Sequence, residues 1–174
     1  MTNNITEKIE SLFWENTFSD VSMDDVALSL GMKKASLYYH FPSKEAMLVE
    51  VINYSYDKYR AYLIDLFEKD KIEEVVSGLI TYSIKEKNLF SIISQKWYCK
   101  IDEIKKIIEQ KNAELTYIFN TYFEQKYKLN KEKLILLQGT IWDLSKRSCL
   151  FDCKEMDIKK ITKEIINLFF NNNK

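Results

Sequence analysis

Scarce glycine and proline constrain the fold of this chain more than any other feature of its sequence. Its 174 residues include three glycines and one proline. Folds rich in strands need many tight turns, and these two residue types make most of such turns. Because 46% of the residues are hydrophobic and 14% are aromatic, the chain has the material for a packed core. The composition therefore predicts helices joined by short connections.

Apolar side chains recur at helical spacing along almost the whole chain. The predicted fold class is all-α, with about nine helices. An N-terminal helical domain is expected over residues 1–45, and a second helical domain over residues 46–174. The predicted helices span residues 5–17, 23–30, 33–40, 44–69, 72–87, 89–98, 101–128, 131–150 and 155–170.

Several classes of protein find no support in the sequence. Residues 1–10 are polar, so no secretory signal peptide is expected, and no apolar run approaches the ~20 residues that cross a bilayer. Cys99, Cys149 and Cys153 are an odd, sparse set, which favours reduced thiols in a cytoplasm over disulfides. A thiol-based metal or redox sensor is the alternative, but no histidine lies near them, and no metal site is predicted. No catalytic arrangement or phosphate-cradling glycine loop is recognisable, so neither an enzyme nor a cofactor is expected.

The helix ends near the N-terminus carry specific signals. Ser22 is placed as the N-cap of the second helix, and the Asp25 carboxylate can answer the Ser22 amide in a capping box. Gly31 is expected to end that helix, because a sharp exit usually needs a left-handed residue. Pro42 ends the third helix, since proline has no amide proton and disfavours helical geometry in the residue before it. Ser43 is the expected N-cap of the long fourth helix.

Two short helices joined by a turn at Gly31 have the form of a DNA-reading helix-turn-helix. Ala27 is small enough for the two helices to cross closely, and Leu37 anchors the second of them from inside. Residues 33–44 carry three lysines and no acid, whereas residues 1–32 carry one lysine and six acids. Such a cationic segment in a chain of zero net charge is typical of a phosphate-binding surface. The side chains left on the outward and flanking faces are Lys33, Lys34, Ser36, Tyr38, Tyr39 and His40.

The segment Val26–Ala46 reads VALSLGMKKASLYYHFPSKEA. It resembles the signature of the TetR family of repressors, most specifically in Leu-Tyr-Tyr-His-Phe followed by Ser-Lys-Glu. The resemblance covers residues 5–52, and the remainder is similar to the family in length and helix order. It implies a homodimeric, cytoplasmic transcription regulator with a three-helix DNA-binding domain and a six-helix effector domain. Such a protein would bind palindromic operator DNA, more often as a repressor, and would release it when a small molecule binds.

The same resemblance implies roles for individual residues. Ser22 would meet a phosphate at the start of the second helix. Lys44 stands in the first turn of the fourth helix, where free amides and the helix dipole attract an anion. For His40, a structural role stays open beside a phosphate contact. The residues that would approach base edges or the adjoining backbone are Lys34, Ala35, Ser36 and Tyr39, and those that would hold phosphates are Tyr38, His40 and Lys44.

Lys33 departs from the family pattern, which often has serine or threonine at that position. The third helix is therefore predicted to lack a side-chain cap, a loss worth about 0.5–2 kcal/mol. Two lysines at a helix N-terminus also oppose the helix dipole. We hypothesise that Lys33 is tuned for phosphate and that DNA supplies part of what the helix end lacks.

An aromatic cavity between helices of the second domain is the predicted ligand site. Two alternatives stay open: aromatic residues at helical spacing also form ordinary core, and Gly78 inside a helix also serves close helix packing. The effector itself is not identified by the sequence. The candidate lining residues are Gly78, Tyr82, Trp97, Tyr98, Tyr117, Phe119 and Trp142.

The last two helices are predicted to form the dimer interface. A helix that is apolar on two sides must bury one side against its own chain and the other against a partner. Pairing across a two-fold axis would give a four-helix interface. Asp143 and Arg147, four residues apart, are expected to form a local ion pair. The candidate interface residues are Leu137, Ile141, Ile158, Ile161, Ile165, Leu168 and Phe169.

Two other function classes stay open. Acidic residues surround the lysine patch, as expected of a helical protein-binding adaptor that keeps the fold without DNA affinity. An all-α enzyme would need a cluster of titrating side chains, for which the sequence offers no support.

Overall fold

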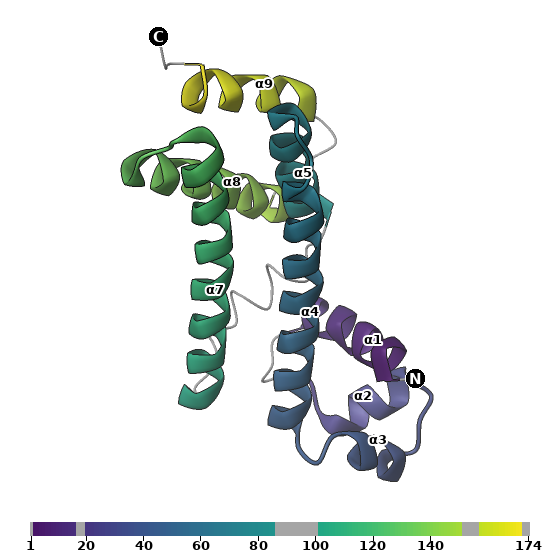
Figure 1. Ribbon diagram of the computed structural model, residues 1–174. Coiled ribbons are helices and arrows are strands. Elements are labelled where there is room, and N and C mark those ends of the chain that lie inside the picture. Colours follow the sequence, from purple (N-terminus) through teal and green to yellow (C-terminus); the bar gives the residue numbers. More distant parts are fainter. Residues whose placement is uncertain (1, 17–19, 86–100, 151–156, 172–174) are drawn as a thin grey trace. The chain divides into compact units, whose positions relative to one another are not determined.

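The computed structural model describes residues 2–16, 20–85, 101–150 and 157–171, and these residues form eight helices and no strand (Figure 1). The predicted all-α fold class is confirmed. The count of eight is close to the predicted nine, and the helix expected over residues 89–98 lies outside the described residues. The helices are α1 (Thr2–Glu15), α2 (Met23–Ser29), α3 (Lys34–His40), α4 (Lys44–Phe67), α5 (Ile72–Lys85), α7 (Asp102–Tyr127), α8 (Lys131–Leu150) and α9 (Ile158–Phe169).

The contacts within the chain group its described residues into two units. One unit holds the described residues of 1–59 together with 101–112, and the other holds 60–85, 113–150 and 157–171. Helices α4 and α7 each contribute residues to both units. This grouping does not test the boundary predicted after residue 45, which stays a prediction.

The first unit is built around α4, which joins α1 and part of α7 through consecutive residues. The hydroxyl of Ser55 donates to the carboxylate of Glu10 on α1, and both residues are buried. The hydroxyl of Tyr56 donates to Oδ1 of Asn112 on α7 at 2.8 Å. Core side chains of this unit are Ile9, Phe13, Val26, Leu37, Met47, Leu48, Val51, Ile52 and Ile108.

The second unit packs α5 against α8 and α9 (Figure 1). The C-terminal half of α4 meets α5 at Gly78, whose carbonyl accepts a 2.9 Å hydrogen bond from the hydroxyl of Tyr62. A Cβ added at Gly78 would lie 2.4 Å from Cδ1 of Leu66. Gly78 therefore permits a close approach of α4 and α5, as expected if this glycine serves close helix packing. An aromatic cluster fills the neighbouring core and consists of Phe67, Phe119, Tyr122, Phe123, Tyr127 and Phe170.

None of the helices in the described residues has both the length and the apolar content that a membrane crossing requires.

Candidate nucleic-acid interface

The start of α2 has the predicted capping box. The amide of Asp25 donates to Oγ of Ser22 at 3.1 Å, and the amide of Ser22 donates to Oδ2 of Asp25 at 2.9 Å. The Ser22 hydroxyl also donates to that carboxylate, at 2.5 Å. These hydrogen bonds from Ser22 lower the pKa of Asp25, because they stabilise the ionised carboxylate. In the free chain, the hydroxyl of Ser22 is thus engaged by Asp25.

The turn between α2 and α3 closes with the geometry expected for a glycine exit. Gly31 has a φ of +64°, which L side chains rarely adopt. The amide of Met32 donates to the carbonyl of Ala27 at 2.8 Å, and the amide of Gly31 donates to that of Leu28 at 3.0 Å. This pair of bonds is a Schellman motif, which satisfies the last carbonyls of α2 and turns the chain into α3.

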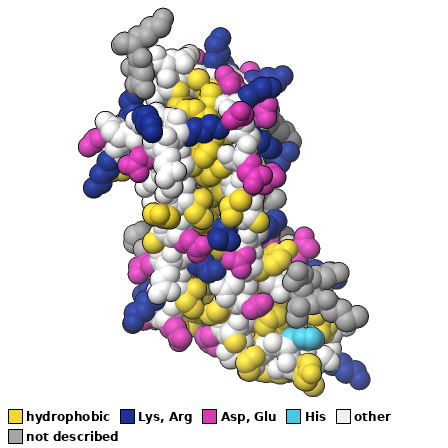
Figure 2. Space-filling model, in the orientation of Figure 1, with side chains coloured by type: hydrophobic (Ala, Val, Ile, Leu, Met, Phe, Trp, Pro, Cys, Tyr) yellow, Lys and Arg dark blue, Asp and Glu magenta, His cyan; other side chains and the backbone are white. Residues whose placement is uncertain are grey.

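Helix α3 is held to the unit by one buried side chain, Leu37. Tyr39 is 88% exposed and Tyr38 is 42% exposed. His40, the chain's one histidine, is exposed beside the Tyr39 ring, with the ring centroids 5.6 Å apart, and Figure 2 shows this histidine among surface apolar groups. The predicted outward-facing residues are all exposed, namely Lys33, Lys34, Ser36, Tyr38, Tyr39 and His40, and so is Ala35.

The N-terminus of α3 has no side-chain cap, as predicted for Lys33. Lys33 has an extended backbone, and its side chain makes no capping hydrogen bond. By contrast, the hydroxyl of Ser43 accepts the amide of Ala46 at 3.1 Å and caps α4 as expected. Lys44, in the first turn of α4, is half-buried, and its charge also helps to lower the pKa of Asp25. The starts of α2 and α4 therefore lie close together.

An ion pair that the sequence analysis missed joins α3 to α2. Nζ of Lys34 lies 2.7 Å from Oδ1 and 2.9 Å from Oδ2 of Asp24. The hydrogen bond to this carboxylate raises the pKa of Lys34. Both side chains are more than half exposed, so solvent screens the pair. Lys33 has no ion pair within the described residues. The charge of Lys34 is therefore partly neutralised within the chain, whereas that of Lys33 is not.

Residues 5–51 of the chain match the family of bacterial regulatory proteins named tetR. The negative transcriptional regulator IcaR of the biofilm operon icaADBC in Staphylococcus aureus is 27% identical to the chain, and the match covers 83% of each protein. Residues 5–51 therefore resemble the N-terminal helix-turn-helix of TetR-family regulators. The chain is thereby similar to transcriptional regulators that bind DNA through this domain.

Solved structures share the fold of this chain. A transcriptional regulator from Aquifex aeolicus is 22% identical, has a TM-score of 0.72, and matches over 98% of this chain and 100% of its own. AibR, solved with isovaleryl coenzyme A and operator DNA, is 16% identical with a TM-score of 0.76, over 96% of each chain. At these identities the likeness concerns the fold alone.

The predicted ligand residues that the structure describes differ in their surroundings. Phe119 is buried in the aromatic cluster, whereas Tyr117 is 71% and Trp142 is 41% exposed. The ring of Tyr82 lies against that of Tyr62 at an angle of 34°, with the ring centroids 4.4 Å apart. Trp97, Tyr98, Cys99 and Cys153 lie outside the described residues, as does the side chain of Cys149.

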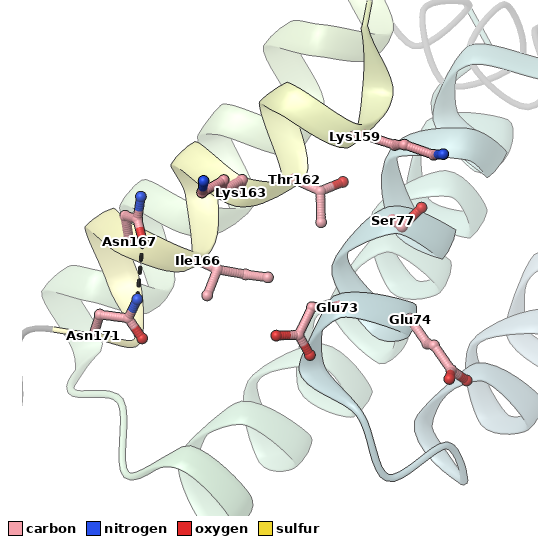
Figure 3. Close-up of a pocket in the computed structure, with 9 residues that line it drawn as sticks. All are labelled: Glu73, Glu74, Ser77, Lys159, Thr162, Lys163, Ile166, Asn167 and Asn171. Atoms are coloured by element: carbon pink, nitrogen blue, oxygen red, sulfur yellow. Dashed lines mark hydrogen bonds between the residues drawn. The ribbon is translucent and has the colours of Figure 1, made fainter.

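A groove that the sequence analysis did not predict lies between α5 and α9 (Figure 3). It has a volume of about 610 Å³. The sequence signal was the row of polar residues on α9 at every fourth position, which resembled an ordinary solvated face. The lining residues are Glu73, Glu74, Ser77, Lys159, Thr162, Lys163, Ile166, Asn167 and Asn171.

The predicted dimer residues divide between the interior and the surface of one chain. Leu137, Ile141, Ile165 and Phe169 are each at most 7% exposed. Ile158 and Ile161 are half-buried, and Leu168 is 62% exposed. The local ion pair of Asp143 with Arg147 is confirmed, at 2.5 Å.

The exposed apolar residues of α8 are ones that the sequence analysis did not select for the interface. Ile135 and Trp142 lie seven residues apart and are 60% and 41% exposed, with the exposed Gly139 between them on the same face. Leu136, beside them, is 62% exposed. The signal in the sequence was this second apolar stripe of α8, which the inward-facing stripe obscured.

Proposed function

We propose that this chain is a TetR-family regulator that binds palindromic operator DNA as a homodimer, acts as a repressor, and releases DNA when a small molecule binds. The observation that carries the proposal is the geometry of α3, a short helix that buries only Leu37 and exposes the predicted DNA-contacting residues that it contains. A helix of this kind fits the major groove, where side-chain donors reach base edges. The proposed reading head is residues 1–45, and residues 46–174 respond to the ligand and dimerise.

Two relatives support repression and a ligand. IcaR is described as a negative transcriptional regulator, and AibR was solved with isovaleryl coenzyme A and operator DNA together. Since operator DNA is the proposed target, we place the regulator in the bacterial cytoplasm. The family consists of regulatory proteins, and we propose no enzymatic activity.

The proposed DNA contacts follow from exposure and charge. Tyr39 is the most exposed aromatic residue on α3 and is assigned to the base edges, together with Lys34, Ala35 and Ser36. Lys44 sits at the N-terminus of α4, where the helix dipole adds to its attraction for phosphate. The other proposed phosphate contacts are Ser22, Lys33, Tyr38 and His40.

Repression and release follow from the spacing of two reading heads. A dimer contacts successive major grooves only if its recognition helices lie about 34–36 Å apart. A ligand that favours another spacing shifts the population away from the DNA-binding state without touching a DNA contact.

Gel shift and fluorescence anisotropy with the gene's own upstream DNA test the proposal. We expect Tyr39→Ala to lower binding to the operator much more than binding to unrelated DNA. Lys44→Ala should weaken both nearly equally and reduce the slope of log K against log salt by about one. Each variant is the other's control, and an equal loss of specificity in both would contradict the division of roles.

A protein-binding adaptor is the second candidate, because Asp24 already neutralises Lys34. An adaptor predicts no shift of upstream DNA by the wild-type chain at low salt, where phosphate contacts are strongest.

A further inference from the structure

The groove between α5 and α9 has opposite charges on its two walls. Its α5 wall carries Glu73 and Glu74, and its α9 wall carries Lys159 and Lys163. Within the described residues, neither lysine forms an ion pair with either glutamate, although Glu74 pairs with Lys71 at 3.4 Å. Glu73, Lys159 and Lys163 thus have no ion pair among the described residues and face the groove with unneutralised charges.

The charges are also separated along the groove (Figure 3). Lys159 extends toward α5 at the end where Ser77 lies, whereas Glu73 lies beside Ile166, nearer the hydrogen-bonded pair Asn167 and Asn171. From position 159 to position 166, a helix rises about 10 Å at 1.5 Å per residue. The two charged ends of the groove are therefore about 10 Å apart along α9.

The dipole of α9 reinforces this separation of charge along the groove. Lys159 lies in the first turn of α9, where the helix dipole is positive, and Asn171 follows its negative C-terminus. The N-terminus of α5 contributes about half a positive charge at the Glu73 end, which the carboxylate of Glu73 exceeds, whereas Glu74 is paired with Lys71. One end of the groove attracts an anion, and the other attracts a cation.

The floor of the groove contains a buried hydroxyl without a partner. Thr162 is 6% exposed, and its Oγ1 makes no hydrogen bond. Figure 3 shows the Thr162 side chain directed from α9 toward α5, beside Ser77. Buried hydroxyls are rarely left unpaired, but this oxygen is closed to solvent, so a ligand in the groove would pair with it only after a small shift of the side chain. Ile166 adds an apolar surface next to it.

We propose that this groove binds a linear zwitterion of the length of a tripeptide. Its carboxylate lies at Lys159 and Lys163, its ammonium group lies at Glu73, and its middle covers Thr162 and Ile166. An extended tripeptide spans about 10 Å, which matches the separation of the charged ends, whereas a single amino acid is too short to reach both. The groove volume of about 610 Å³ lies within the usual range of small-molecule sites.

This inference deepens the proposed function, because a peptide bound here is a candidate for the small molecule that releases DNA. The binding itself is measured without DNA, by isothermal titration of the full-length chain with the tripeptide alanyl-leucyl-alanine. We expect saturable binding with free termini, and at least tenfold weaker binding when the peptide is N-acetylated or C-amidated.

Matched variants locate the site. Glu73→Gln and Lys159→Gln should each weaken binding of the free tripeptide about tenfold, and Thr162→Val a few-fold. Glu164→Gln and Lys160→Gln change the same charges on α9 outside the groove and should bind like the wild type. Circular dichroism verifies that each variant is folded before titration.

Absence of tripeptide binding at millimolar concentration would overturn the inference, as would equal binding of the blocked peptides or unchanged binding by Glu73→Gln and Lys159→Gln. A gel shift run in parallel keeps the two proposals distinct. Operator binding without peptide binding overturns the groove assignment alone. Peptide binding without any DNA binding supports the groove and overturns the proposed function.

Discussion

Lys33 and Lys34 are neighbours on the proposed DNA-reading surface and have different electrostatic surroundings. Lys34 is held by Asp24 at 2.7 Å, whereas Lys33 has no ion pair within the described residues. A lysine that is already in an ion pair contributes less free energy to phosphate binding. Its acidic partner must either be displaced or stay close to the negatively charged DNA backbone. Asp24 thus lowers the non-specific attraction of this surface for DNA.

Asp24→Asn should strengthen binding to unrelated DNA about three- to tenfold and steepen its salt dependence by about one unit. Specificity, measured as the ratio of operator to non-operator affinity, should fall, because the freed lysine attracts every sequence. Asp57→Asn is the control, since it removes another exposed ion pair and the same charge from the same unit. An equal gain in both variants would assign the effect to net charge instead of to Lys34.

Lys33→Ser should weaken DNA binding and raise the free energy of unfolding. Serine at this uncapped position can accept a backbone amide of α3, so the free energy of unfolding should rise by about 1 kcal/mol in chemical denaturation. Affinity for DNA should fall, and the salt slope should drop by about one. Lys33→Ala separates the two effects, because it removes the charge without adding a cap. Unchanged DNA affinity and salt dependence in both variants would refute a phosphate role for Lys33.

At the scale of elements, the contact between α4 and α5 depends on a missing side chain. A Cβ at Gly78 would lie 2.4 Å from Cδ1 of Leu66, which is 1% exposed and has little room to move. It would also lie 3.0 Å from the Tyr62 hydroxyl, which hydrogen-bonds the Gly78 carbonyl. Close packing therefore outweighs the helix propensity that glycine loses.

Gly78→Ala should lower the free energy of unfolding by about 1 kcal/mol, since overpacking costs about 1–3 kcal/mol and the helix gains up to about 1 kcal/mol. In a Leu66→Ala background the 2.4 Å contact is absent and the 3.0 Å approach to the Tyr62 hydroxyl remains, so the same substitution should stabilise the chain by up to about 0.5 kcal/mol. A double-mutant cycle by urea denaturation measures this change of sign. The same effect in both backgrounds would show that Leu66 does not set the cost.

At the scale of the whole molecule, the exposed apolar stripe of α8 is the surface that a second copy is expected to cover. Ile135, Gly139 and Trp142 share one face, and the glycine leaves room for a partner helix to approach. Ile165 and Phe169 of α9, by contrast, are already buried within their own chain. The dimer contacts proposed from the structure are therefore centred on α8 and the exposed Leu168.

Ile135→Lys should raise the dimer dissociation constant about 100-fold or more, because an unpaired charge buried in an interface costs about 3–5 kcal/mol. Sedimentation velocity over a range of concentrations should show a dimer for the wild type and a monomer for this variant. Leu28→Lys is the control, since Leu28 is 82% exposed on α2 and should leave the dimer intact. A variant Ile135→Lys that remains dimeric would move the interface elsewhere.

Local signals explain why the N-terminal region was predictable. The capping box of Ser22 with Asp25, the left-handed Gly31 and the cap at Ser43 each involve residues within a few positions of one another. Their geometry follows from backbone hydrogen-bonding requirements that any context must satisfy. The exposure of Tyr39 followed as well, because one inward residue on a two-turn helix fixes which others face outward.

The sequence by itself determined the helical class, the helix ends and the DNA-reading surface, since these depend on neighbours along the chain. Only the tertiary structure decided which apolar stripe of α8 turns inward, which acid pairs with Lys34, and that α5 and α9 leave a charged groove between them. Each of these depends on side chains brought together from different helices. Periodicity shows that a helix has an apolar face but not what covers it.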